Sequence, residues 1–225
     1  NGQVAVIGGA GSNGSGGTTD LASIEVFDPD AGTFTATSAS LSGAREGHHA
    51  FLLPNNNNVL IVGGTSGGTA LSSSELFTVQ ISPSNGAWSY TISSTGAMNS
   101  ARAGATGSSN QLNGPTSVVG AKPGYVLIAG GTDATAASLA STELYGYPTV
   151  QTDHADYPPG TTVNITGSGF KANETVTISL VEFPLIDTHG PYTVTADAGG
   201  NISDSSFVTD THDENVRFYM SAGGS

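Results

Sequence analysis

The chain of 225 residues contains no cysteine. This absence excludes a disulfide, a thiolate metal site and a cysteine nucleophile. Charged residues are also scarce, at 10% of the chain, against about 25% in an average soluble domain. Only five residues are Lys or Arg and 18 are Asp or Glu, so the formal net charge is −13. Without a basic patch, we expect no binding to nucleic acid or to anionic lipid headgroups.

Long apolar runs and helical periods are missing as well. No apolar run approaches the roughly 20 residues that cross a bilayer, so we expect no direct membrane insertion. Short apolar strands alternate instead with clusters of Gly, Asn, Pro and Ser, a pattern that predicts an all-β chain. The chain begins at Asn1 without an initiator Met. We interpret it as a mature or trimmed product of a secreted or cell-surface protein, bacterial in type.

A repeat organises the first two thirds of the chain. Three apolar strands end in Gly-Gly, and an acidic-aliphatic-aromatic triplet follows each of them. The strands with their Gly pairs span residues 4–9, 59–64 and 126–131, and the triplets begin at Glu25, Glu75 and Glu143. A period of roughly 50 residues favours the blades of a β-propeller.

One repeat can be followed in full after Arg45. It predicts four strands, at residues 49–53, 59–62, 74–79 and 88–92, and four antiparallel strands make a propeller blade. The first repeat lacks its first strand and the third lacks its fourth, so about ten strands are expected. The third repeat also carries a polar insertion at residues 108–124.

The Gly pair, the Glu-x-aromatic triplet and the Arg-x-Gly-His start together resemble kelch repeats of bacterial surface proteins. The resemblance covers residues 1–148 and implies a partial propeller of about three blades, incomplete at both ends. Closed propellers have about four to eight blades. We therefore expect that the chain belongs to a longer polypeptide or to an oligomer in which another chain completes the arc.

A second unit is expected at residues 158–225, after a linker at residues 149–157. Its short segments alternate apolar and polar residues with period two, which indicates half-buried strands of a small β-sandwich. The expected strands lie at residues 163–166, 176–180, 192–195, 206–208 and 216–220. The run from Pro159 to Phe170 resembles the opening of bacterial immunoglobulin-like domains.

The acidic and basic residues of the repeat are structural candidates. One active site needs one set of catalytic residues, whereas these recur in register. A structural ion pair explains the recurrence better, and the planar donor fork of Arg suits such a pair. We expect Glu75 to pair with Arg45 or Arg102; the full set is Glu25, Glu75, Glu143, Arg45 and Arg102.

Two further groups of residues are weaker candidates. His48 and His49 are expected to be structural, with a ligand pocket as the alternative. Two Asp/His pairs, Asp187 with His189 and His212 with Asp213, could bind Zn²⁺ or Ca²⁺. Loop capping is the favoured interpretation of these pairs. Because no third and fourth ligand is evident in the sequence, we expect no tight transition metal and no cofactor.

The favoured function is a non-enzymatic, secreted or cell-surface module for binding or assembly. Its partner would be a glycan, a protein or copies of itself. One alternative is a subunit of an extracellular structural polymer. Another is a carbohydrate-active enzyme, since the order of propeller and sandwich resembles galactose oxidase-like proteins. The copper cofactor of that family needs a Tyr-Cys crosslink, which a chain without cysteine cannot form.

Overall fold

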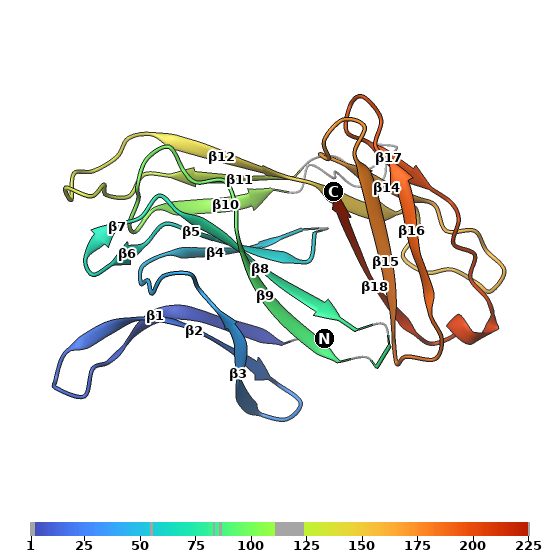
Figure 1. Cartoon of the computed structure of the whole chain (residues 1–225), viewed down its shortest axis with the longest axis horizontal. Coiled ribbons are helices and arrows are strands. Elements are labelled where there is room, and N and C mark those ends of the chain that lie inside the picture. The colour runs from blue at the N-terminus through green and yellow to red at the C-terminus, as the bar shows by residue number, and fades with distance from the viewer. Residues whose placement is uncertain (1–2, 55, 83, 86, 111–123, 225) are drawn as a thin grey trace.

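The computed structural model describes residues 3–54, 56–82, 84–85, 87–110 and 124–224. Within these ranges the chain is all-β, and its one helical element is the 3₁₀ turn η1 (Thr211–Asp213). Small antiparallel sheets form two groups, one on each side of a central boundary (Figure 1). Among the described residues, no helix has the length and apolarity needed to span a bilayer.

Three sheets follow one another in the first group. The first contains β1 (Val4–Ser12), β2 (Thr18–Asp28) and β3 (Thr33–Ser40). The second contains β4 (His49–Leu53), β5 (Asn58–Val62), β8 (Ser74–Ile81) and β9 (Trp88–Ser94). The third contains β10 (Thr106–Asn110), β11 (Gly124–Ala129) and β12 (Thr142–Tyr147). A two-stranded hairpin, β6 (Thr65–Ser66) with β7 (Thr69–Ala70), projects from the second sheet.

The strand positions predicted for the full repeat are present, and its four strands pair in chain order. Most of the insertion expected at residues 108–124 lies outside the described residues. The three sheets also share one register. The Gly-Gly strand pairs with the triplet strand through Val6 and Glu25, Ile61 and Glu75, and Ile128 and Glu143. The sequence repeat is therefore a repeat of structure, position by position.

The sheets pack face to face through two apolar cores. Ile24 and Leu41, from the first sheet and the segment after it, meet Ile61 and Phe77 of the second sheet. On its other face, the second sheet contacts the third through a core that includes Leu60, Val62, Val126 and Ile128. Each inner sheet face is thus buried against the next repeat. Figure 1 shows the three sheets stacked in chain order, from blue through green to yellow.

The Gly pair is required where one repeat meets the next. Gly63 and Gly64 have φ angles of 62° and 85°, a left-handed conformation that side chains rarely adopt. A Cβ atom on Gly63 would lie 2.4 Å from the carbonyl oxygen of Arg102. The backbone N–H of Gly64 donates a hydrogen bond of 2.9 Å to that same oxygen. The pair therefore allows the segment before the third sheet to dock on the second.

The second group is a pair of three-stranded sheets around one core. One sheet contains β13 (Thr149–Thr152), β14 (Ile165–Ser168) and β17 (Ile202–Asp204). The other contains β16 (His189–Thr195), β15 (Thr175–Phe183) and β18 (Arg217–Gly224). Val163, Ile165, Val176, Ile178 and Phe207 are buried between them.

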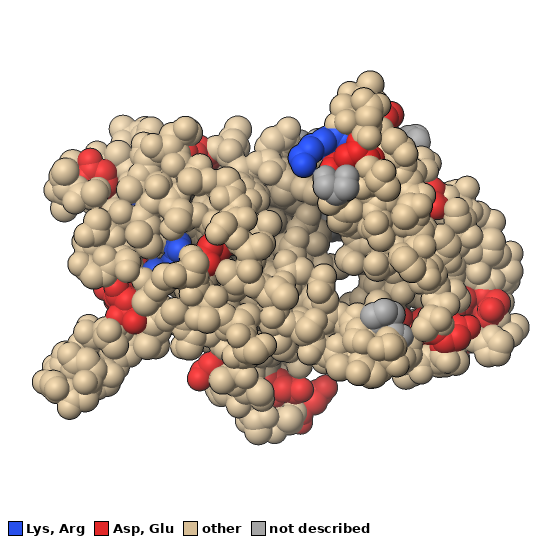
Figure 2. Space-filling view, in the orientation of Figure 1, with Lys and Arg blue, Asp and Glu red and all other residues tan. Residues whose placement is uncertain are grey.

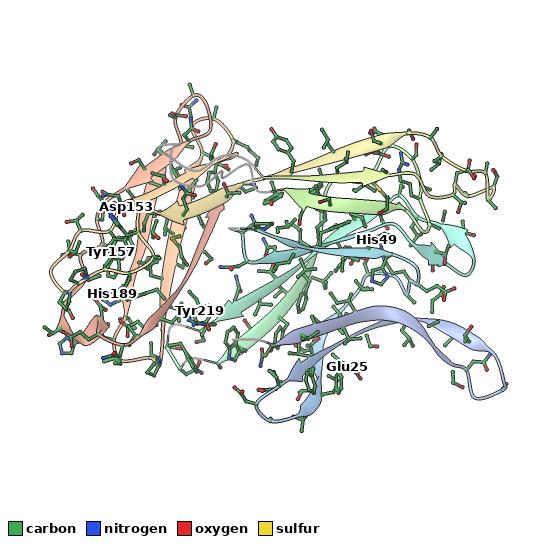
Figure 3. All side chains as sticks on the ribbon, turned by 180° about the vertical axis from the view of Figure 1, so that it is seen from behind. Glu25, His49, Asp153, Tyr157, His189 and Tyr219 are labelled. Atoms are coloured by element: carbon green, nitrogen blue, oxygen red, sulfur yellow. The ribbon has the colours of Figure 1, made fainter. Side chains whose placement is uncertain are left out.

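Two sequence expectations for this unit differ from the structure. Residues 149–152 of the expected linker form β13, which pairs with β14. Residues 206–208, expected as a strand, make only an isolated bridge from Val208 to Thr162. After β13, the carboxylate of Asp153 accepts hydrogen bonds from Asn164 and Tyr157 (Figure 3). These hydrogen bonds hold the pKa of Asp153 below its usual range, and the bond from the Asn164 side chain has the largest effect.

Candidate functional site

The first recurring ion pair joins the first and second sheets. Arg45 Nη2 lies 2.5 Å from Glu75 Oε1, and both side chains are almost fully buried. The backbone N–H of Ser42 donates to Glu75 Oε2 at 2.9 Å. Arg45 Nη1 also donates to the carbonyl oxygens of Gly63 and Ser73. Of the two arginines expected as partners of Glu75, the structure thus pairs it with Arg45, from the segment between β3 and β4.

The second ion pair repeats this arrangement one sheet later. Arg102 Nε lies 3.1 Å from Glu143 Oε1, and Arg102 Nη1 donates to the carbonyl oxygens of Gly130 and Ser141. The backbone N–H groups of Asn99 and Ser100 donate to the carboxylate. Burial alone would raise the pKa of Glu143, but these hydrogen bonds outweigh burial and lower it. Both pairs join packed segments, which is a structural role.

Glu25 is the exception among the recurring residues. It stands opposite Val6 in β1, as Glu75 stands opposite Ile61 in β5. However, its side chain is exposed, and within the described ranges it forms no ion pair. Figure 3 labels it on the first sheet, at one end of the stack. The expected pair is therefore present in the second and third repeats and not around Glu25.

Among the described residues, neither of the two adjacent histidines belongs to a group of side chains that could hold a metal ion. His48 lies at the joint between the first two sheets, where its ring is close to Gly8. Burial first, and the charge of Arg45 second, lower the pKa of His48. His49 begins β4 and stacks on Phe51, with ring centroids 5.8 Å apart. Neither His48 nor His49 lines the groove or the polar hollow between the two groups of sheets, which are described next.

A groove of about 840 Å³ runs along the boundary between the two groups (Figure 2). Val79 and Trp88 line it from one side, and Leu180 and Tyr219 line it from the other. Trp88 and Tyr219 meet edge to face, with ring centroids 5.5 Å apart. This aromatic pair joins the two groups of sheets, and the side-chain amide of Asn57 also donates across the boundary, to the carbonyl oxygen of Met220.

A more polar hollow of about 600 Å³ adjoins the groove at the same aromatic pair. Carboxylate, amide and guanidinium groups surround the two rings there. These side chains are Gln3, Asp28, Asp30, Asn215 and Arg217. Hydrogen bonding to the backbone N–H of Ala31 is the main cause that lowers the pKa of Asp28. The hollow therefore combines aromatic faces with hydrogen-bonding groups.

Four chemically reactive side chains converge in the sandwich. Nε2 of His189 lies 2.9 Å from Glu182 Oε1, 2.8 Å from Asp187 Oδ1 and 3.0 Å from Asp213 Oδ1. They come from β15, the loop before β16, the start of β16 and η1. We call these four residues the His189 cluster.

The His189 cluster is mostly withdrawn from solvent. The side chains of Glu182 and Asp213 are 1% and 4% exposed, that of His189 13%, and that of Asp187 39%. The backbone N–H groups of Ile186 and Asp187 donate to Glu182 Oε2. The ring of His189 packs against Phe207 and Phe218.

The electrostatics of this cluster follow from burial and crowding. Burial is the main cause that raises the pKa of Glu182, against the two backbone N–H groups, which lower it. Burial would lower the pKa of His189, but the hydrogen bond to Glu182 and the charges of Asp213 and Asp187 together raise it. Burial therefore dominates the pKa shift of Glu182, whereas the neighbouring carboxylates dominate that of His189.

The structure corrects the sequence interpretation of the metal candidates. Asp187, His189 and Asp213 do come together, but His212 lies outside the cluster, 66% exposed and bonded to Asp210. Glu182, which the sequence did not single out, joins Asp187, His189 and Asp213 in a group that could hold a metal ion. Asp210 and His212 form a second, more exposed group with Asp187. The available signal for Glu182 was a carboxylate placed directly after Leu180 and Val181, two buried residues of an apolar strand.

Comparison with known proteins adds little. No family model matches the chain, and no curated protein matches it. A solved structure described as "Structure of YjhT" aligns with a TM-score of 0.42 and 14% sequence identity, over 77% of this chain. The chain covers 58% of that structure's length. A likeness of this size carries no argument about fold family or function.

Proposed function

We propose that the chain is a non-enzymatic assembly and binding module of a secreted or bacterial cell-surface protein. In this proposal its first three sheets are blades of a partial kelch-type propeller, and its last two form an immunoglobulin-like sandwich. The shared strand register and the recurring Arg–Glu pair support the repeat, and the two-sheet core supports the sandwich.

One observation carries the assembly function. We call the side chains Val4, Val6, Glu25 and Phe27 the leading face of the first sheet. Their counterparts in the second sheet are Val59, Ile61, Glu75 and Phe77, by the shared register. Ile61, Glu75 and Phe77 are at most 1% exposed because the first sheet covers them, whereas Val4 and Val6 are 54% and 46% exposed. The leading face thus has the residues of a sheet–sheet interface, and none of the sheets that the structure describes covers it.

The opposite end of the stack has the matching surface. Leu127 of β11 and Leu144 of β12, here called the trailing face, are 43% and 68% exposed. Their counterparts in the second sheet, Leu60 and Leu76, pack on the third sheet. Since a leading face packs on a trailing face inside the chain, the same contact can form between the trailing face of one copy and the leading face of another.

Such a contact uses two different surfaces and is head to tail. Contacts of this kind either close into a ring or continue as a filament. The filament is the polymer alternative, and the ring is a closed oligomer. Burying an exposed Val, Leu or Phe stabilises an interface by about 1.5–3 kcal/mol when burial is complete, so the apolar residues of the two faces favour association.

The catalytic alternative is disfavoured by the position of Glu182. This carboxyl has a raised pKa, which is a common mark of a catalytic acid. However, its side chain is 1% exposed, behind His189. A general acid must lie within hydrogen-bond reach of its substrate, and a group so buried does not.

The assembly function can be tested with one charge at the leading face. We expect the wild-type chain to gain mass with concentration in multi-angle light scattering. Val6→Asp should reduce that association, because it places a carboxylate in the apolar contact. Val208→Asp is the matched control, since Val208 is a valine of similar exposure, 50%, on the sandwich. A wild-type chain that stays monomeric at high concentration contradicts the proposal.

A second candidate function is glycan binding at the polar hollow. Sugars present apolar C–H faces and many hydroxyls, which suit the rings of Trp88 and Tyr219 and the carboxylates of Asp28 and Asp30. Trp88 is the one tryptophan of the chain, so intrinsic fluorescence reports on this hollow. A soluble oligosaccharide that binds there should shift the emission, and Tyr219→Ala should abolish the shift, whereas Tyr125→Ala should not. Identical titrations for wild type and Tyr219→Ala contradict this candidate.

A further inference from the structure

The His189 cluster contains more acceptors than donors. A histidine ring nitrogen can donate at most one proton, yet three carboxylate oxygens lie within 3.0 Å of Nε2 of His189. One proton can serve one of these oxygens in good geometry. The nitrogen therefore cannot donate to the other two oxygens, although both lie within 3.0 Å of it.

Asp187 shows this mismatch directly. Its Oδ1 atom is inaccessible to solvent, and it receives no hydrogen bond. The atom nevertheless points to Nε2 of His189, 2.8 Å away. A buried acceptor without a donor is unfavourable, and a metal ion bound between Asp187 and His189 would satisfy this oxygen.

The surroundings do not balance the charge either. Three carboxylates and one imidazole carry a net negative charge, even with the ring protonated. Within the described part of the chain, no Lys or Arg forms an ion pair with any of the four residues. Their ligand atoms all lie within 4.8 Å of one another, which places them around a single point.

We propose that Glu182, Asp187, His189 and Asp213 bind one divalent transition metal ion, with Zn²⁺ as the ion that fits best. Zn²⁺ takes nitrogen and oxygen ligands at about 2.0–2.2 Å in a four-coordinate arrangement. Ca²⁺ prefers six to eight oxygen ligands at longer distances, and the central imidazole disfavours it. The set of one nitrogen and three carboxylate oxygens matches Zn²⁺ in both number and type.

The bound ion would hold three elements together. Glu182 lies near the end of β15, His189 begins β16, and Asp213 ends η1. Asp187 lies in the loop between the two strands, and it is the most exposed of the four ligands. The ion therefore fixes that loop and η1 on the sandwich. The site is independent of the leading and trailing faces, so it goes beyond the assembly function proposed above.

The test uses the full chain, stripped with EDTA and titrated with ZnCl₂ by calorimetry, with metal content measured after gel filtration. We expect one Zn²⁺ per chain and a rise in the thermal midpoint, because a ligand that binds the folded state stabilises it. CaCl₂ at the same concentration should give neither effect. His189→Ala should abolish binding, whereas the matched control His154→Ala, which removes a histidine that is 70% exposed and pairs with Asp153, should bind as wild type does.

Two further measurements test the proposal even if the His189→Ala variant does not fold. Asp187→Asn alters the most exposed ligand, and it should weaken Zn²⁺ binding at least about tenfold, since even outer-shell partners cost 10–100-fold. Co²⁺ bound to the wild-type chain should give visible absorption bands of a four-coordinate site. The proposal is overturned if the folded wild-type chain takes up no stoichiometric Zn²⁺, if Ca²⁺ binds in preference, or if Asp187→Asn binds Zn²⁺ as wild type does.

Discussion

Glu25 and Glu75 occupy the same position in two successive sheets, yet their environments are opposite. Each stands opposite an apolar residue in the neighbouring strand, two residues before an aromatic ring. Glu75 is fully buried and paired with Arg45, whereas Glu25 is exposed. Since the local sequence is alike, the difference arises from what covers each sheet. Burial in this chain is therefore set by the neighbouring repeat and not by the residue itself.

The largest difference in the free energy of unfolding is expected between variants of the buried Glu75 and of the exposed Glu25. Glu75→Ala leaves the guanidinium of Arg45 buried without a partner, which should lower the free energy of unfolding by about 3–5 kcal/mol. Glu25→Ala should change it by less than about 0.5 kcal/mol, as is usual for exposed positions. Urea unfolding followed by circular dichroism measures both. Equal losses in the two variants would remove the distinction between the sheets.

The apolar residues beside these carboxylates should follow the same order. Ile61→Ala opens a cavity between the first two sheets and should cost about 2–5 kcal/mol. Val6→Ala removes a side chain that is 46% exposed, so it should cost well under half as much in dilute, monomeric protein. The same urea titrations apply. A Val6→Ala loss as large as that of Ile61→Ala would mean that the leading face is already covered.

A smaller, pH-dependent effect is expected at the joint between the two sheets. The pKa of His48 is lowered by burial and by Arg45, so the unfolded chain binds a proton more readily than the folded chain. Stability contributed by neutral His48 is therefore complete above about pH 6.5 and is lost as the pH falls towards the lowered pKa. His48→Asn should flatten this part of the stability–pH curve. An unchanged slope in that variant would assign the acid sensitivity to other groups.

The sequence predicted the repeat well because its signals are local. Four strands between residues 49 and 92, the Gly pairs and an ion pair of Glu75 with Arg45 or Arg102 all follow from short, recurring patterns, and the structure selects Arg45. The His189 cluster could not be assembled in this way. Glu182 and Asp213 are far apart in the sequence. They meet at His189 only because β15 and η1 pack together in the folded sandwich. The strand β13 was missed for a related reason, since its partner β14 follows a long loop.

The absence of cysteine makes the central claim directly measurable. A chain with Val6→Cys and a second chain with Leu127→Cys place one thiol on the leading face and one on the trailing face. If the trailing face of one copy packs on the leading face of another, mild oxidation of the mixture should form mainly the mixed disulfide dimer. A mixture in which the Val208→Cys chain replaces the Val6→Cys chain should not form this mixed dimer. Mixed dimers no more frequent than with Val208→Cys would contradict the account.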